Sequence, residues 1–422
     1  MEADVVVVGA GLAGLRCAGV VAEAGLEVVV LEAADAPGGR IRTDRVDGFL
    51  VDRGFQVLNP AYPAVRRWVD VDALQLQPFG AGVAAVTDER RTALGDPLRA
   101  PRLLAPSVRT ALGAPKDVAA LLRWAGPLLR PRRGTRLSQV VARRDDVDRA
   151  TALDRRGVDG VVRRVLDQFL SGVVLEDDGS TADRYVLLLA WMFARGVPSL
   201  PTAGMQALPA QLARPLGDRL RLGHRAETVG ATSVVTDQGT WLARRVVVAT
   251  GAGEAHRLTG VPVPATKGVT TLWWSAPEAP ESALLHVDAR RTPVGPLVNA
   301  AVVSRAAPSY APAGCHLVEA SALRGPGREP DEAAMRRHAG DLLGADPTPW
   351  EAVARQDVRD ALPAQPAPFS EQRPVEVGEL LVCGDHRDTG SIQGALVSGQ
   401  RAADAVLAGL AGPGGTPGRA RT

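Results

Sequence analysis

The fold is decided by residues 5–14, VVVVGAGLAG, near the N-terminus of the 422-residue chain. Four consecutive valines are typical of a parallel strand that is buried on both faces. A Gly-x-Gly-x-x-Gly pattern follows at once, and an apolar helical pattern then runs to Gly25, which can end a helix in the left-handed conformation. A second apolar strand at residues 27–31 stops at Glu32. The sequence therefore predicts a strand, a tight turn, a helix and a second parallel strand.

Each glycine of this turn has a physical task. Gly9 permits the tight bend, Gly11 lets a phosphate approach the backbone, and Gly14 lets the helix pack closely on the strand. The free N–H groups at the helix start, around Leu12 and Ala13, and the helix dipole favour an anion there. The turn is therefore a candidate pyrophosphate site.

An acidic residue stands about 20 residues beyond the turn, as in dinucleotide-binding folds. Glu32, with Ala33 beside it, can accept hydrogen bonds from the hydroxyls of an adenosine ribose, and its charge would repel a 2′-phosphate. We interpret residues 5–33 as a dinucleotide-binding unit. The alternative is a glycine-rich turn in an ordinary α/β protein.

Two further glycine-containing pieces follow, APGGRIR at residues 36–42 and GFLVDRGFQ at residues 48–56. Two glycines of the first piece bring the backbone near a second phosphate face, and its first arginine can neutralise that phosphate. The block resembles the FAD-binding start of the superfamily of flavin amine oxidases, protoporphyrinogen oxidases and phytoene-desaturase-type enzymes. The family pattern, G-G-R and then D-x-G, is matched by Gly38, Gly39, Arg40, Asp52 and Gly54. The resemblance implies one FAD, with Gly54 beside the isoalloxazine ring; the alternative is a charged surface loop.

This family holds FAD with pieces that lie far apart in sequence, and the C-terminal half contains candidates for them. RVVVATG at residues 245–251 resembles a buried strand ending in Thr-Gly, and ELLVCGD at residues 379–385 resembles the C-terminal flavin motif. A helix from about residue 390 to Leu407 would point its N-terminal N–H groups at the flavin N1–C2=O edge. The cofactor contacts that the resemblance implies here are Ala226, Thr250, Gly251, Gly384, Asp385, Ser391, Ile392, Gln393 and Ala395. The alternative is a generic strand, loop and helix that close the domain.

Asp385 and Ala226 of this set, and the nearby Cys383, have individual interpretations. Asp385 would accept a hydrogen bond from a ribityl hydroxyl or lie near the pyrophosphate. Ala226 stands where the family has a valine against the adenine, so this single contact departs from the pattern. Cys383 falls inside the expected strand and is interpreted as a core residue, so we expect FAD to be bound non-covalently.

The resemblance implies an α/β fold with a discontinuous Rossmann-type FAD-binding domain and a mixed α+β substrate domain, in a glutathione-reductase/p-hydroxybenzoate-hydroxylase-like topology. We expect the FAD-binding domain to comprise residues 1–77, 199–265 and 373–410, and the substrate domain residues 78–198 and 266–372. The Gly/Pro-rich tail, residues 411–422, is expected to be disordered.

The substrate half departs from the amine oxidases. Lys267 lies near the strand that carries their flavin-facing lysine but is out of register, and Trp273 and Trp274 are interpreted as packing residues. These departures favour an apolar, carbon-centred substrate. We expect an FAD-dependent oxidoreductase of the dehydrogenase or desaturase kind, which passes a hydride from a C–H bond to flavin N5. The alternatives are an oxygen-using amine oxidase or protoporphyrinogen-type oxidase, a non-redox flavin-dependent isomerase, and a flavin-binding scaffold.

The sequence does not identify a general base. His386 follows the C-terminal flavin motif and is the candidate, although a histidine in a loop after a strand is more often structural. Gly54 is the position expected at the flavin face, and His286 and His316 rank behind His386.

Composition limits the partners. A net charge of +2, from 49 basic and 47 acidic side chains, gives no case for nucleic acid. Three cysteines without a C-x-x-C pair fit no zinc site, so we expect no metal and a reducing, cytoplasmic setting. We expect neither a secretory signal nor a membrane span.

Residues 97–136 are basic, apolar and Trp-bearing, and could lie on an anionic membrane surface to draw a lipophilic substrate from it. A solvated lid or a subunit contact is the alternative, and the oligomeric state is not predicted.

Overall fold

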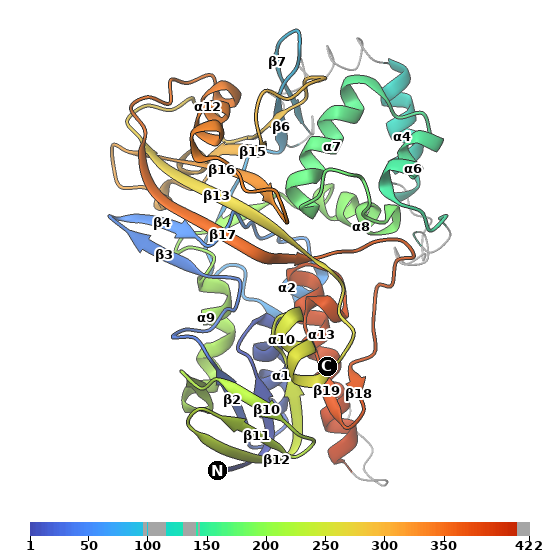
Figure 1. Cartoon of the computed structure of the whole chain (residues 1–422), viewed down its shortest axis with the longest axis vertical. Helices are drawn as coiled ribbons and strands as arrows, with labels where there is room; N and C mark the ends of the chain where they lie inside the picture. Colours follow the sequence, from blue (N-terminus) through green and yellow to red (C-terminus); the bar gives the residue numbers. More distant parts are fainter. Residues whose placement is uncertain (96–98, 100–114, 130–140, 142–143, 412–422) are drawn as a thin grey trace.

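A computed structural model describes residues 1–95, 99, 115–129, 141 and 144–411 of the chain. Two β-sheets organise these residues, an eight-stranded sheet in the lower half of Figure 1 and a seven-stranded sheet in the upper half. Helices flank both sheets. The architecture is therefore mixed α/β, as the sequence predicted.

The eight-stranded sheet contains the valine strand at its centre. Its members are β1 (Glu2–Val8), β2 (Val28–Glu32), β9 (Leu220–Leu222), β10 (Ala226–Val229), β11 (Ser233–Thr236), β12 (Gly239–Val248), β18 (Glu376–Val377) and β19 (Leu380–Val382). The order is β10-β11-β12-β1-β2-β9, with β19 also beside β12 and β18 beside β19. β1 runs parallel to both β2 and β12. The buried strand expected within residues 245–251 is the end of β12, which is one continuous strand from Gly239 to Val248.

The valines of β1 are buried on both faces of this sheet, which confirms the prediction. Val5 and Val7 pack into one hydrophobic cluster, together with helices on that side. Val6 and Val8 point the other way and pack into a second cluster. Because successive side chains of a strand alternate between faces, a run of four valines requires cover on both.

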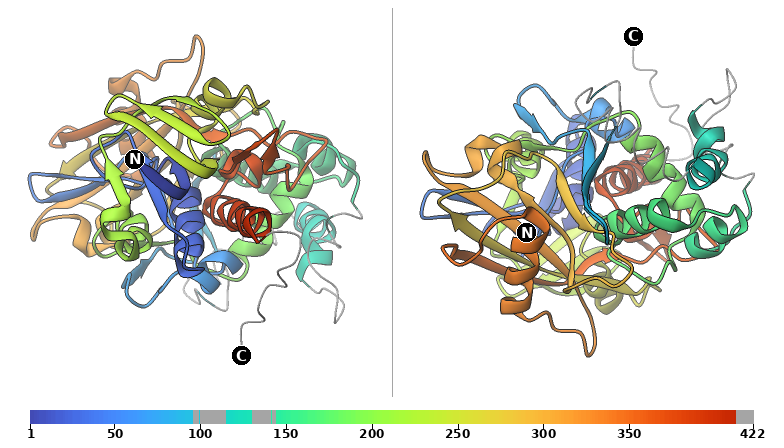
Figure 2. Two further views of the ribbon diagram at one scale, coloured as in Figure 1. Left: turned by 90° about the horizontal axis from the view of Figure 1, so that it is seen from below. Right: turned by 90° about the horizontal axis from the view of Figure 1, so that it is seen from above.

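Helices α1 (Leu12–Glu23) and α13 (Ile392–Leu410) lie side by side against this sheet, as the view from below shows (Figure 2). The approach is close, because a Cβ placed on Gly399 of α13 would lie 2.2 Å from the carbonyl oxygen of Ala13. Also in the lower half are α9 (Ala207–Ala213), the 3-10 helix η2 (Arg214–Arg219) and α10 (Ala252–Thr259). The two ends of the sequence thus build one layer.

The seven-stranded sheet forms the upper half. Its members are β6 (Gly82–Val86), β7 (Arg91–Gly95), β13 (Thr266–Ala276), β14 (Leu285–Asp288), β15 (Leu297–Val302), β16 (His316–Arg324) and β17 (Glu351–Pro363). Their order is β17-β13-β16-β15-β14-β6-β7, and all pairs are antiparallel except β6 with β14. Helix α12 (Glu332–Leu343) contributes to the core that covers one face.

Shorter elements join the two halves. They are β3 (Thr43–Val46), β4 (Phe49–Asp52), α2 (Pro63–Trp68), β5 (Leu76–Pro78), β8 (Ser199–Pro201), α11 (Val303–Ala306), η3 (Pro308–Tyr310) and η4 (Asp385–Arg387). β3 pairs with β4, and β5 with β8. The domain boundaries expected from the sequence stay a prediction.

Four helices group beside the upper sheet: α4 (Pro115–Leu129), α6 (Arg149–Arg155), α7 (Gly160–Val174) and α8 (Asp183–Phe193). Most of residues 160–193 are therefore helical. α4 is the part of the basic segment 97–136 that the structure describes as an element. Its Trp124 is buried and donates a hydrogen bond from Nε1 to Asp183 Oδ1 at 2.6 Å, whereas Leu122 is 55% exposed. Trp124 therefore packs inward and does not face a membrane.

Much of segment 97–136, and residues 412–422 of the tail expected to be disordered, lie outside the described residues. None of the described helices is long and apolar enough to cross a bilayer.

We predict opposite effects from the same substitution at two glycines of α1. A Cβ on Gly14 would lie 2.0 Å from the carbonyl oxygen of Gly9, so Gly14→Ala should lower the free energy of unfolding by about 2 kcal/mol or more. A Cβ on Gly19 would meet nothing within 4 Å, so Gly19→Ala should raise it by about 0.5–1 kcal/mol through helix propensity. Urea unfolding followed by circular dichroism would measure both, and equal effects would contradict the close packing of α1.

Candidate functional site

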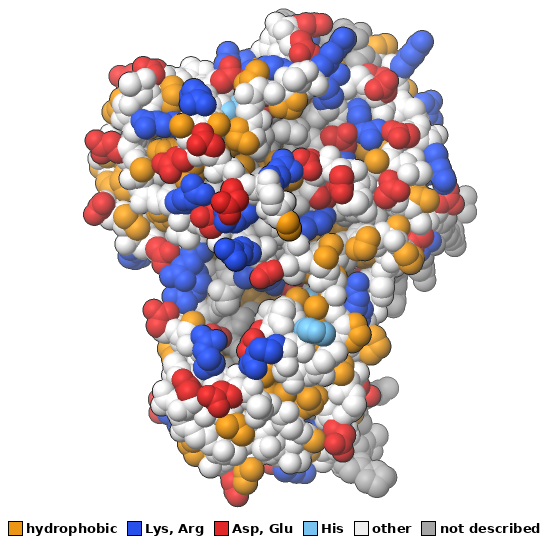
Figure 3. All heavy atoms as spheres, viewed as in Figure 1, with side chains coloured by type: hydrophobic (Ala, Val, Ile, Leu, Met, Phe, Trp, Pro, Cys, Tyr) orange, Lys and Arg blue, Asp and Glu red, His pale blue; other side chains and the backbone are white. Residues whose placement is uncertain are grey.

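A cavity of about 910 Å³ lies between the carboxyl ends of the central parallel strands and the upper sheet. This volume falls within the roughly 300–1,000 Å³ typical of ligand pockets. The molecule is hollowed at the waist between its two halves, with charged side chains of both signs around the hollow (Figure 3). Eighteen of the residues predicted from the sequence line the cavity, namely Gly9, Gly11, Leu12, Ala13, Glu32, Ala33, Gly38, Gly39, Arg40, Gly54, Ala226, Thr250, Gly251, Gly384, Asp385, Ser391, Ile392 and Ala395.

The three glycines of the first turn differ in what requires them. Gly9 has φ +104°, and a Cβ there would lie 2.9 Å from the carbonyl oxygen of Ala249, so the backbone itself needs a glycine. Gly14 is required by the contact of α1 with Gly9. Gly11 has an ordinary φ of −72° and free space around the position of a Cβ. Neither strain nor crowding explains Gly11, whereas a phosphate lying against the backbone does.

Other glycines of the cavity resemble Gly11 in leaving empty space. A Cβ on Gly251 would meet nothing within 4 Å, and one on Gly54 nothing nearer than Val358 at 3.7 Å. Gly11 and Gly251 are also the N-caps of α1 and α10, and neither helix has a side-chain cap. Uncapped helix N-termini present free N–H groups, which suit an anion. The residues present therefore fit an FAD, and Gly11 and Gly251 would hold its phosphates.

Glu32 ends β2 and is held rigidly. Its Oε2 accepts a hydrogen bond from the backbone N–H of Ala10 at 2.7 Å, and its Oε1 accepts one from Ala34 at 2.9 Å. A carboxylate has room for about four hydrogen bonds, so acceptor capacity remains on the cavity side. This geometry suits the ribose contact that the sequence predicted.

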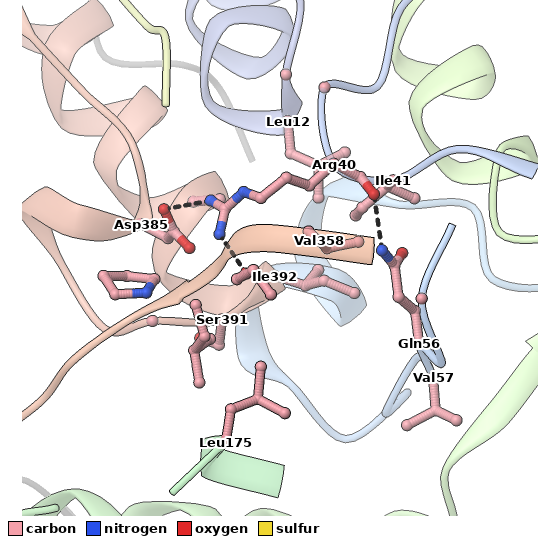
Figure 4. Close-up of a pocket in the computed structure, with 18 of the residues that line it drawn as sticks. Leu12, Arg40, Ile41, Gln56, Val57, Leu175, Val358, Asp385, Ser391 and Ile392 are labelled. Carbon is pink, nitrogen blue, oxygen red and sulfur yellow. Dashed lines mark hydrogen bonds and ion pairs between the residues drawn. The ribbon is translucent and has the colours of Figure 1, made fainter. Parts of the chain in front are cut away.

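Arg40 and Asp385 join two distant segments in the cavity. Arg40 Nη2 lies 2.6 Å from Asp385 Oδ1, and Nη1 donates to the carbonyl of Ala361 at 2.7 Å (Figure 4). The pKa of Arg40 is raised, chiefly by the charge of Asp385. Gln56 Nε2 donates to the Arg40 carbonyl at 2.7 Å. The sequence assigned these two side chains to the cofactor separately, whereas the structure pairs them with each other.

Two predicted cofactor contacts, besides Gly14, point away from the cavity. Asp52 is buried and accepts hydrogen bonds from Thr43 Oγ1 at 2.5 Å, Met205 N at 3.1 Å and Tyr310 Oη at 2.9 Å. Burial raises the pKa of Asp52 to about 6. Gln393 Oε1 accepts a hydrogen bond from the backbone of Ala64 in α2. Both side chains tie elements together beneath the cavity wall.

The structure does not bring His386 to the cavity. The side chain is completely buried beside Gly384, and burial lowers its pKa to about 4, so the ring is neutral. Neither ring nitrogen has a hydrogen-bond partner among the described residues. His286 and His316 also lie outside the lining. None of the three histidines singled out from the sequence therefore lines the cavity, whereas His224, between β9 and β10, does.

The side chains that the sequence analysis compared with amine-oxidase features also lie outside the cavity lining. Lys267 is not in the lining; its Nζ donates to Val174 O at 3.3 Å and Thr181 Oγ1 at 3.1 Å. Trp273 and Trp274 are each 1% exposed and pack into different clusters on opposite faces of β13. Their interpretation as packing residues is confirmed.

The upper wall of the cavity is mostly apolar, and no sequence motif predicted it. Four of the six phenylalanines in the chain line the cavity, and they form two edge-to-face pairs. The apolar lining on this side comprises Phe55, Val57, Phe79, Val83, Phe169, Val173, Leu175, Leu189, Phe193, Val269, Leu285 and Val358. The chain has few phenylalanines, so each could have been examined as a candidate lining residue. Nothing in the sequence, however, indicated that four of them would meet at one cavity.

Polar side chains interrupt this wall on the upper sheet. Asn299 and Ser321 line the cavity and are 4% and 3% exposed. Ser321 Oγ donates a hydrogen bond at 2.5 Å to Oε1 of Glu319, which is fully buried. Burial raises the pKa of Glu319 to about 8, so its carboxyl is neutral near pH 7.

We predict that Gly11→Val yields a folded protein without FAD, because the new side chain would occupy the space of a phosphate. The bound FAD per protein, read from flavin absorbance, should fall at least about tenfold, with the circular dichroism spectrum unchanged. Gly19→Val makes the same change on the same helix outside the cavity and should keep full FAD. Full FAD in Gly11→Val would contradict the site.

We also predict that Glu319→Gln removes a pH-dependent loss of stability. The folded protein keeps the Glu319 proton up to about pH 8, whereas the unfolded chain releases it at about pH 4.5. The contribution of this proton to the free energy of unfolding is therefore complete below pH 4.5 and is lost as the pH rises toward 8. Relative to wild type, Glu319→Gln should gain a few kcal/mol of unfolding free energy between about pH 5 and about pH 9. Urea unfolding of wild type and Glu319→Gln at about pH 5 and about pH 9 measures this difference in unfolding free energy. The same change with pH in both proteins would contradict the prediction.

Known proteins resemble this chain in sequence and in structure. An L-amino acid oxidase of Lachesis muta is 46% identical over 77 residues, which are 18% of this chain and 15% of that protein. The chain thus matches only about 15% of the length of such curated relatives. A solved double mutant of putrescine oxidase superposes with a TM-score of 0.73 at 19% identity, covering 97% of this chain and 99% of the other. Cyclohexylamine oxidase from Brevibacterium oxydans superposes at 0.68 and 17% identity, covering 97% and 100%.

The structural likenesses show the fold, and the match of residues 12–407 to a family description shows more. That description is "Flavin containing amine oxidoreductase". Together with the glycine cradle, this match shows that the chain belongs to the family of flavin-containing amine oxidoreductases.

Proposed function

We propose that the protein is an FAD-dependent oxidoreductase that removes hydrogen from an apolar small molecule, as dehydrogenases and desaturases do. The observation that carries this proposal is the apolar wall that closes the cavity opposite the glycine cradle. Its phenylalanine, valine and leucine side chains suit a hydrocarbon surface and exclude water. Among the acidic residues of the described lining, Glu32, Glu254 and Asp385 come from the lower half, and Asp360 lies near the end of β17, where its charge acts on Arg40.

When bound, FAD would supply the acceptor for the two electrons and the hydrogen that leave the substrate. The chain supplies the cradle, through Gly11, Gly251 and the N-termini of α1 and α10. Ser391 caps α13 by accepting a hydrogen bond from Gly394 N at 3.1 Å, and it lines the cavity with Ile392. The dipole of α13 would stabilise negative charge in the cavity.

Near Gly54 the protein positions a substrate by shape. A Cβ on Gly54 would lie 3.7 Å from Val358 Cγ2 and 4.0 Å from Val269 Cγ1, so two branched side chains face the backbone of Gly54 across a narrow gap. A planar group lying at Gly54 would contact both valines. Packing of this kind fixes the orientation of the reacting C–H bond.

An oxygen-using amine oxidase is the second candidate. The family match and the names of the relatives, L-amino acid oxidase, putrescine oxidase and cyclohexylamine oxidase, support it. The acidic side chain that the upper sheet adds to the described lining, Asp360 of β17, lies where its charge acts on Arg40, and Lys267 lies outside the lining. These two features favour the apolar substrate. A peripheral membrane contact through residues 97–136 would suit such a substrate and remains part of the proposal.

Anaerobic reduction of the flavin tests the proposal. We expect the absorbance of the bound flavin near 450 nm to bleach with polyprenes or other apolar hydrocarbons and not with simple alkylamines. Bleaching by amines alone, with hydrogen peroxide released on aeration, would establish the amine oxidase instead. Conversion of an apolar substrate without bleaching would indicate an isomerase, and no conversion of any compound would indicate a scaffold.

A further inference from the structure

The apolar wall of the cavity contains the amide side chain of Asn299. This residue belongs to β15, and α7 packs against that strand. Asn299 is 4% exposed and lines the cavity. An amide in such a place costs free energy unless its polar atoms find partners. We therefore asked which of its two polar atoms meets the cavity.

The two amide atoms of Asn299 differ in their access to the cavity. Oδ1 is fully buried and has no hydrogen-bond partner in the described part of the chain. Nδ2 is not among the fully buried atoms, and no described residue accepts a hydrogen bond from it. The reverse orientation would bury two N–H donors in place of one oxygen, and burying unpaired donors is costly. Asn299 therefore meets the cavity with a pair of free N–H groups.

Gly172 of α7 leaves room for this amide. A Cβ on Gly172 would lie 2.3 Å from Asn299 Nδ2, so any side chain there would displace the amide. Gly172 also lines the cavity, which places Nδ2 at the cavity surface. Glycine within a helix lowers stability by about 0.5–1 kcal/mol relative to alanine. The space needed by the Asn299 amide is a physical reason for glycine at this position.

The surroundings of the amide are neutral and mostly apolar. Phe169 and Val173 of α7 line the cavity together with Gly172. The register partner of Asn299 on β16 is Ser321, whose hydroxyl bonds to Glu319. Burial raises the pKa of Glu319 to about 8, so this carboxyl is uncharged near pH 7. Such surroundings favour an uncharged ligand atom over an ion.

The geometry points to a subsite in which Asn299 Nδ2 donates a hydrogen bond to an uncharged acceptor oxygen, such as a ketone carbonyl, of an otherwise apolar substrate. This inference rests on the proposed function and narrows its substrate class to apolar molecules that carry such an oxygen. A hydrocarbon of the same shape would cover the amide and leave its N–H groups unpaired. An ammonium ion has no lone pair to offer them.

Calorimetric titration of the FAD-loaded protein with acetophenone and α-methylstyrene tests the subsite. The two probes have the same shape, with C=O in the ketone and C=CH₂ in the alkene, and only the ketone accepts a hydrogen bond. We expect the ratio of ketone affinity to alkene affinity to fall about 5–10-fold in Asn299→Leu, because leucine has a similar size and no N–H group.

A second variant and a control accompany this substitution. Gly172→Ala keeps Asn299 but forces Nδ2 away from its place, so the ratio should fall there too. Ser171→Ala is the matched control on the same helix. Ser171 is buried, bonds to the Asp167 carbonyl and does not line the cavity, so its variant should keep the wild-type ratio. If Asn299→Leu does not fold, Gly172→Ala decides.

The outcomes separate this inference from the function on which it rests. An unchanged ratio in both variants would overturn the subsite, even if both probes bound more weakly, because an equal loss reports only the shape of the wall. A higher ratio in Asn299→Leu would overturn it as well. Failure of both probes to bind to wild type would instead contradict the apolar cavity, and with it the proposed function.

Discussion

The close contact between α1 and the turn before it is the constraint on which the site depends. Gly14 lies against the carbonyl of Gly9, and Gly9 in turn lies against Ala249 after β12. Any side chain at Gly9 or Gly14 would push α1 away from the ends of β1 and β12. With the contact in place, the N-terminus of α1 opens into the cavity, and Gly399 brings α13 against α1 so that its N-terminus opens there too. Two helix dipoles therefore converge on one cavity.

The cofactor half could be predicted because its signals are local. The task of each glycine in residues 9–14 depends on neighbours within one strand, one turn and one helix, so the pattern alone carries it. The apolar wall could not be predicted in this way. Phe55, Phe79, Phe169 and Phe193 come from separate segments, and their convergence depends on how the upper sheet and the helices beside it pack over the lower sheet. No short pattern encodes such a long-range arrangement.

The sequence placed some residues near the cofactor that the structure turns away, and the reason is side-chain direction. On α13, Ile392 and Ala395 are three residues apart and share the face that lines the cavity, whereas Gln393 between them turns toward α2. Gly54 lines the cavity, but Asp52, two residues earlier, is directed into the core by three hydrogen bonds. A motif specifies which segments approach a cofactor, while the packing of each segment decides which side chains reach it.

Charge is distributed unevenly along the cavity, and this distribution suits two unlike molecules. At the cradle, Glu32 and the Arg40–Asp385 pair are held by backbone N–H groups, carbonyls and each other. On the upper sheet, Glu319 has only Ser321 as a described hydrogen-bond partner and no cation beside it, so the low dielectric keeps it protonated. Ionising Glu319 would place an unpaired charge behind the apolar wall. Keeping the proton lets the same cavity bind an anionic dinucleotide at one end and a nearly apolar molecule at the other.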